Sequence, residues 1–121
     1  MKDSIYFKEK RKYPRVDMDL PADYWVKHDS YAHAGIVIDA SETGFLIYSV
    51  EDIPIGTKLK IAVLFPREYE LANFEVSAEI IRKKALEKGE KGYQYGIRFT
   101  RILHEEYRKL RGLFIEKLLG G

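Results

Sequence analysis

Residues 74–80, Phe-Glu-Val-Ser-Ala-Glu-Ile, alternate without exception between apolar and polar side chains. Because successive side chains of a β-strand point to opposite faces, this segment predicts a strand with one face in a core and the other in water. Such half-buried strands are typical of antiparallel sheets, whereas strands of parallel sheets are apolar on both faces. The segment therefore indicates an antiparallel β-protein.

Five other short segments of the chain have strand-like apolar patterns and are separated by turn residues. They predict strands at residues 22–27, 32–40, 45–50, 58–65 and 93–100. Six short antiparallel strands favour a closed barrel, because closure leaves no strand edge unpaired.

The apolar period changes after residue 100. Apolar residues there recur at helical spacing on one side, at Leu103, Tyr107, Leu110, Phe114 and Leu118. The opposite side is charged, so an amphipathic helix is expected to pack on the barrel or to cover one of its ends. The predicted fold is mainly β, a six-stranded antiparallel β-barrel with a C-terminal α-helix, formed by residues 21–121.

Length and composition limit the class of protein. The 121 residues are enough for one domain, and 45% hydrophobic residues are typical of a packed core. The 21 Lys plus Arg against 19 Asp plus Glu leave a net charge of only +2, so any anion site must be local. The chain has no cysteine, no apolar run long enough to cross a bilayer and no secretory signal, which predicts a cytoplasmic protein without membrane insertion.

Residues 1–20 carry the densest charge and are predicted to form a flexible basic N-terminal arm. Residues 11–15 of this arm read Arg-Lys-Tyr-Pro-Arg. Pro14 biases the segment towards an extended shape, in which the α-carbons of Arg11 and Arg15 lie up to about 13 Å apart. Two guanidinium groups so placed could contact separate phosphates or the edge of a guanine base. A solvated basic terminus is the alternative.

Residues 39–44, Asp-Ala-Ser-Glu-Thr-Gly, form a second candidate site at the end of a predicted strand. If the strand extends through Ser41, the side chains of Asp39 and Ser41 emerge on the same face. Gly44 adds a position that tolerates a positive φ or lets another group approach closely. These groups could bind the polar edge of a ring. The alternative is an ordinary hairpin turn, in which the Asp and Ser side chains bond nearby amides.

The two motifs together resemble those of the PilZ domain family, the bacterial receptor module for cyclic di-GMP. Residues 11–15 fit its Arg-x-x-x-Arg motif, and residues 39–44 fit its Asp/Asn-x-Ser-x-x-Gly motif. Residues 95–99, Tyr-Gly-Ile-Arg-Phe, are similar to the final strand of the family. The resemblance covers nearly the whole chain and implies a barrel with a C-terminal helix, in agreement with the periodicity.

The resemblance also implies roles for the motif residues. Arg11 and Arg15 would contact the phosphates and guanine of cyclic di-GMP, as the arm folds over the ligand. Asp39, Ser41 and Gly44 would receive a guanine base.

Two further basic residues are candidates for ligand binding. Lys10 precedes the first motif arginine, at a position that in the family bears on whether one ligand or a stacked pair is bound, and a basic residue there favours the pair. Arg98 is expected on the outward face of its strand. For Arg98, the alternative is an exposed strand arginine that pairs with a neighbouring carboxylate.

Catalysis and binding of nucleic acid polymers are less well supported. His28, His33 and His104 lack the spacing of metal ligands, and the sequence contains no Walker loop or nucleophile motif. No enzyme activity, metal or cofactor is therefore predicted. The aromatic residues of the last strand alternate towards the core, which argues against a surface for stacking nucleic acid bases.

The sequence thus predicts a noncatalytic receptor that binds cyclic di-GMP and relays the signal through a conformational change to an unknown downstream protein. Formation of a homodimer stays open. The alternative function is a nucleotide-independent protein-interaction domain of PilZ-like fold.

Overall fold

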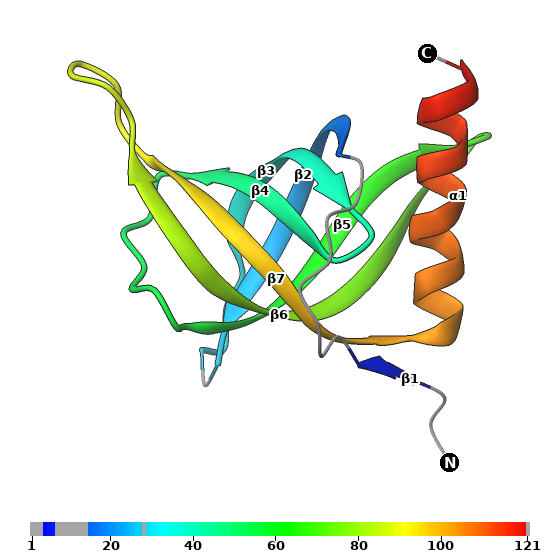
Figure 1. Cartoon of the computed structure of the whole chain (residues 1–121), viewed down its shortest axis with the longest axis horizontal. Coiled ribbons are helices and arrows are strands. Elements are labelled where there is room, and N and C mark those ends of the chain that lie inside the picture. Colours follow the sequence, from blue (N-terminus) through cyan, green and yellow to red (C-terminus); the bar gives the residue numbers. More distant parts are fainter. Residues whose placement is uncertain (1–3, 7–14, 28, 121) are drawn as a thin grey trace.

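The computed structural model describes residues 4–6, 15–27 and 29–120 (Figure 1). In chain order, these residues form β1 (Ser4–Tyr6), β2 (Val16–Val26), β3 (His33–Ser41), β4 (Gly44–Ser49), β5 (Lys58–Arg67), β6 (Glu70–Ala85), β7 (Tyr93–Leu103) and α1 (His104–Gly120). Figure 1 shows the strands β2–β7 wrapped around a common centre, with α1 standing alongside.

The strands β2–β7 form a closed antiparallel ring. Their order is β7-β4-β3-β2-β5-β6, and the ring closes because β6 also pairs with β7. The short β1 adds to β7, where Ser4 pairs with Leu103. The predicted class is confirmed: the protein is mainly β, with antiparallel strands followed by a C-terminal helix.

The hydrophobic core fills the inside of the ring. On β6, the apolar residues of segment 74–80 are at most 2% exposed, whereas the polar residues between them lie on the outer face. The rings of Phe45 and Phe99 meet edge to face in this core, with centroids 4.6 Å apart. The outer face of β6 is therefore polar over this segment, and the candidate site lies on the outer face of the ring.

The ring begins at Val16, before the boundary after residue 20 that the sequence predicts between arm and barrel. Val16, Met18 and Leu20 point into the core and are 3–9% exposed. The charged residues Asp17 and Asp19 occupy the positions between them, and a bulge interrupts the pairing with β3 at this point. The outward carboxylates make this half of β2 look like part of a charged arm.

The helix α1 packs mainly against β6 and β2. Its buried residues are Leu110, Leu113 and Phe114. Leu118, which the spacing predicts on the packed side, is 67% exposed, because the last turns of α1 extend past the positions that contact the ring. The helix therefore covers the ring with its first half and middle only.

Candidate functional site

Arg15 of the first motif and Asp39 of the second meet at one corner of the ring. Val16 pairs with Ala40 across β2 and β3, so Arg15, directly before β2, lies beside the residues that flank Ala40. Its Nε donates a hydrogen bond to Oδ1 of Asp39 at 2.5 Å. The side chains of Arg15 and Asp39 are 43% and 20% exposed, so this ion pair is open to water and to a ligand. Arg11 and Lys10, the other two basic residues predicted for the site, lie outside the described residues.

Ser41 and the turn after it are fixed by local hydrogen bonds. The Ser41 side chain is only 2% exposed, and its Oγ accepts a hydrogen bond from the backbone N–H of Thr43 at 3.2 Å. The carbonyl oxygen of Thr43 in turn accepts from the backbone N–H of Phe99 at 2.9 Å, which anchors the turn to β7. β3 extends through Ser41, so alternation puts the Asp39 and Ser41 side chains on the same side of the strand, but Asp39 is partly exposed whereas Ser41 is buried.

Gly44 is required by the close approach of β4 to β7. A Cβ at this position would lie 2.1 Å from the carbonyl oxygen of Ile97, which is far inside van der Waals contact. The φ of Gly44 is not among the positive values of the chain, so of the two sequence-based explanations the close approach is the one observed. The lack of a side chain at Gly44 thus allows the motif turn to lie close against β7.

Arg98 lies directly opposite Gly44 across the β4–β7 pairing and opposite Glu79 across the β7–β6 pairing. Its Nη2 donates to Oε1 of Glu79 at 2.8 Å. Its Nε is buried and has no hydrogen-bond partner among the described residues. The alternative expected from the sequence, a strand arginine paired with a carboxylate, is therefore the arrangement observed, and a role in ligand binding stays a prediction.

Arg82 is a residue of this surface that the sequence reasoning missed. Gly96 pairs with Leu46 on one side and with Arg82 on the other, and Leu46 pairs with Asp39, so Arg82 lies in the same row across the strands as Asp39. A Cβ at Gly96 would meet Nε of Arg82 at 2.8 Å, which shows that the arginine side chain lies over this glycine. The only available signal was the glycine itself, because the strand was expected to end near Ile80 and β6 continues to Ala85.

The helix α1 contacts the motif turn through Tyr107, which interacts with the side chains of Glu42 and Arg111. Burial raises the pKa of Tyr107, and the carboxylate of Glu42 acts in the same direction, while the guanidinium of Arg111 acts against it. The phenol therefore stays neutral at physiological pH. The contact between Tyr107 and Glu42 thus links the position of the motif turn to α1.

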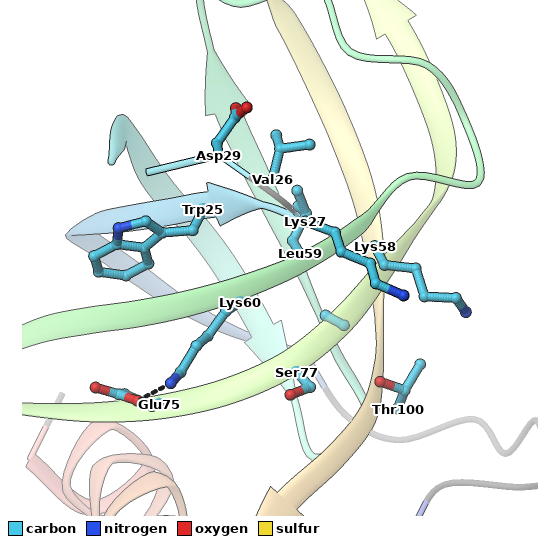
Figure 2. Close-up of a pocket in the computed structure, with 11 residues that line it drawn as sticks. Trp25, Val26, Lys27, Asp29, Lys58, Leu59, Lys60, Glu75, Ser77 and Thr100 are labelled. Carbon is cyan, nitrogen blue, oxygen red and sulfur yellow. Dashed lines mark ion pairs between the residues drawn. The ribbon is translucent and has the colours of Figure 1, made fainter. Parts of the chain in front are cut away.

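A groove of about 570 Å³ lies on another part of the outer face (Figure 2). Its apolar lining includes Trp25 and Val26 from the end of β2, and its rim carries Lys27, Lys58 and Lys60. Figure 2 shows Lys60 paired with Glu75 at 3.2 Å on one side of the groove. The lining contains no residue of either motif, and neither Arg98 nor Arg82 belongs to it.

No group of three or more His, Cys, Asp or Glu side chains within the described ranges is arranged to hold a metal ion. No helix in the described part of the chain is long and apolar enough to span a bilayer.

Comparison with known proteins gives a family and two similar folds. The family model of the PilZ domain matches residues 9–116. The chain is similar to the inhibitor of motility MotI/DgrA of Bacillus subtilis, with a TM-score of 0.75 and 16% identity, over 93% of this chain and 53% of that one. It is also similar to the PilZ domain of YcgR from Escherichia coli, solved with c-di-GMP, with a TM-score of 0.67 and 15% identity, over 90% and 92% of the two chains.

At these identities, the structural likeness shows the fold alone. The chain spans about half (53%) of the length of the motility inhibitor. No curated protein matches the sequence.

Proposed function

Because this chain belongs to the PilZ domain family, we propose that it is a noncatalytic receptor for cyclic di-GMP that passes the signal to a partner protein. PilZ domains are receptor and adaptor domains. The observation that carries the proposal is the contact between the two motifs, in which Arg15 meets Asp39 at 2.5 Å. The c-di-GMP in the similar structure of the YcgR domain supports the choice of ligand.

In the proposed complex, the outer face over β3, β4 and β7 receives the ligand, between Arg15 at the start of β2 and Arg82 on β6. The carboxylate of Asp39 is suited to accept hydrogen bonds from a guanine ring edge. The guanidinium of Arg15, with five donors in a planar fork, is suited to a phosphate. Arg98 and Arg82 add cationic groups further along the same face, on β7 and β6.

Binding in this arrangement is an exchange of partners. Arg15 and Asp39 already satisfy each other, so the ligand must replace one ion pair with two sets of charge-assisted contacts. Arg11 and Lys10 would join as the arm closes. Ordering the arm costs about 1–2 kcal/mol per residue in backbone entropy, so closure requires contacts to both phosphates to offset that cost.

The signal would leave the site along two routes. Closure of the arm changes the surface around the start of β2. A shift of the motif turn acts on α1 through the contact of Glu42 with Tyr107. If cyclic di-GMP tightens the binding of a partner that prefers the closed form, linkage requires the partner to tighten the binding of cyclic di-GMP by the same factor. The similar Bacillus protein is an inhibitor of motility, which is consistent with action on another protein.

The alternative is a protein-interaction domain of the same fold that binds no nucleotide. The groove beside Trp25 favours this alternative, because a partly apolar groove with a lysine rim is suited to a protein segment.

Titration calorimetry separates these functions. We expect binding heat with cyclic di-GMP and none with GTP or single-stranded DNA, together with a rise in melting temperature only for cyclic di-GMP. Absence of both heat and a melting shift at high micromolar cyclic di-GMP would reject the receptor function and favour the interaction domain.

A further inference from the structure

We propose that Glu79 is an internal competitor for the ligand, which holds Arg98 in an ion pair and so lowers the affinity of the nucleotide site. This inference rests on the proposed function and adds to it a residue that lies in neither motif.

The strand register places Glu79 between two cations on the outer face of the ring. It lies opposite Arg98 in the pairing of β6 with β7 and opposite Lys58 in the pairing of β5 with β6. Its Oε1 accepts from Nη2 of Arg98 at 2.8 Å and lies 3.9 Å from Nζ of Lys58. The Glu79 side chain is 23% exposed, so water screens this carboxylate only in part.

The ion pair draws Arg98 away from the motif turn. β7 lies between β4, which carries Gly44, and β6, which carries Glu79. A guanidinium bonded across to β6 therefore directs Nη2 to the side of the strand opposite the motif. Meanwhile Nε, which is buried without a hydrogen-bond partner among the described residues, leaves part of the donor fork unused. In this position Arg98 is bonded to Glu79 instead of facing the ligand site. The negative charge of Glu79 also repels an approaching phosphate.

Lys58 lowers the free-energy cost of releasing Arg98 from Glu79. If a phosphate takes Arg98, the Glu79 carboxylate is not left unpaired, because Nζ of Lys58 is already 3.9 Å away. If Lys58 were absent, the loss of Arg98 would leave the Glu79 carboxylate without a cation, and the free-energy cost of releasing Arg98 would be larger. The three side chains thus form a relay in which Glu79 exchanges Arg98 for Lys58 as the ligand binds.

The experiment is a calorimetric titration of cyclic di-GMP into the whole chain and its variants. Glu79→Gln keeps the shape of the side chain and removes the charge, so we expect affinity to rise about two- to fivefold. Glu75→Gln is the matched control, because Glu75 lies on the same outer face of β6, changes net charge equally and pairs with Lys60 instead of Arg98. We expect Glu75→Gln to leave affinity unchanged.

Two further variants test the mechanism rather than the charge. In an Arg98→Ala background, Glu79→Gln should raise affinity clearly less than in the unmodified chain, since the competed residue is gone and only the repulsion between carboxylate and phosphate is relieved. Lys58→Ala should weaken binding more than Lys60→Ala, since only Lys58 can replace Arg98 at Glu79.

The outcomes are distinct. If the unmodified chain binds cyclic di-GMP but Glu79→Gln weakens binding, leaves it unchanged or matches Glu75→Gln, the competitor role is overturned while the receptor function stands. If neither the unmodified chain nor Glu79→Gln binds cyclic di-GMP, the proposed function itself is rejected. Binding by Glu79→Gln alone would support both.

Discussion

The Arg15 guanidinium donates a hydrogen bond to the Asp39 carboxylate at 2.5 Å, between residues 24 positions apart in the sequence. Each belongs to a different motif, and each lies at the end or just outside of a strand. In the proposed complex, a guanine edge donates hydrogen bonds to Asp39 and a phosphate accepts them from Arg15. A single ligand that carries both groups can therefore replace both partners of this ion pair.

Asp39→Asn tests the carboxylate half of the pair. We expect affinity for cyclic di-GMP to fall about tenfold or more, because hydrogen bonds to a charged acceptor are stronger than those to an amide. The free energy of unfolding should change by less than about 1 kcal/mol, since the pair is exposed to water. Asp52→Asn is a suitable control, because Asp52 pairs with Lys83 away from both motifs. Calorimetry and urea denaturation give the two values, and a large loss of stability with unchanged affinity would make the pair structural.

Arg15→Ala tests the cationic half. We expect it to abolish tight binding of cyclic di-GMP and to leave the melting temperature of the free protein nearly unchanged. Arg67→Ala, at the exposed end of β5, is the control for loss of one positive charge. Affinity of the unmodified chain should also fall as ionic strength rises, because contacts between arginine and phosphate are screened by salt. If the affinity for cyclic di-GMP changed neither with Arg15→Ala nor with ionic strength, a contact between Arg15 and phosphate would be excluded.

The alternation of residues 74–80 was sufficient to predict the antiparallel class, because the outer face of β6 is polar at each intervening position. The first half of β2 was missed for the opposite reason. Its outward residues, Asp17 and Asp19, extend the charge of the preceding segment and conceal the buried residues between them. A bulge at the same place also breaks the pairing with β3, so strict alternation is a weaker guide there.

The resemblance to the PilZ domain implied that Arg15 and Asp39 serve one ligand site, and the structure brings their side chains into contact. Their shared role in binding stays a prediction. Glu79 and Arg82 could not be found in this way, because only the pairing of β6 with β7 brings them beside the motif strands. That pairing contains a register shift between Ile80 and Arg82, which no sequence pattern indicates. A family resemblance can therefore suggest which motif residues come together, whereas contacts of other residues across a sheet require its register.

Gly44→Ala separates the structural role of the motif glycine from any role in binding. The added methyl group would lie 2.1 Å from the backbone oxygen of Ile97, which cannot move without disturbing β7. We expect the free energy of unfolding to fall by about 1–3 kcal/mol or more in the absence of any ligand. Gly112→Ala is a control of opposite sign, because Gly112 lies in α1 with nothing within 4 Å of its added Cβ. That variant should gain up to about 1 kcal/mol from helix propensity.

Equal stabilities for Gly44→Ala and the unmodified chain in urea denaturation would contradict this interpretation. The close approach of β4 to β7 would then have to relax at little cost, and the glycine would have to be explained by the ligand alone.

Alkaline pH provides a test of the core that is independent of ligand. Burial raises the pKa of Tyr24, although its hydrogen bond with Ser49, at 2.7 Å between the two oxygens, acts in the opposite direction. In the unfolded chain a tyrosine loses its proton near pH 10, whereas the folded protein retains it to higher pH. The stability from this difference is therefore complete below about pH 10 and is lost as pH rises through the folded pKa.

We expect Tyr24→Phe to reduce the slope with which the free energy of unfolding falls above pH 10, since phenylalanine has no proton to lose. The loss should be only partial, because burial also raises the pKa of Tyr95 and Tyr107. Tyr69→Phe is the matched control, because it removes the same phenol oxygen from a side chain that is fully exposed and outside the core. Urea denaturation from pH 8 to pH 11 measures the slopes, and an identical slope in Tyr24→Phe and Tyr69→Phe would show that folding does not raise the pKa of Tyr24.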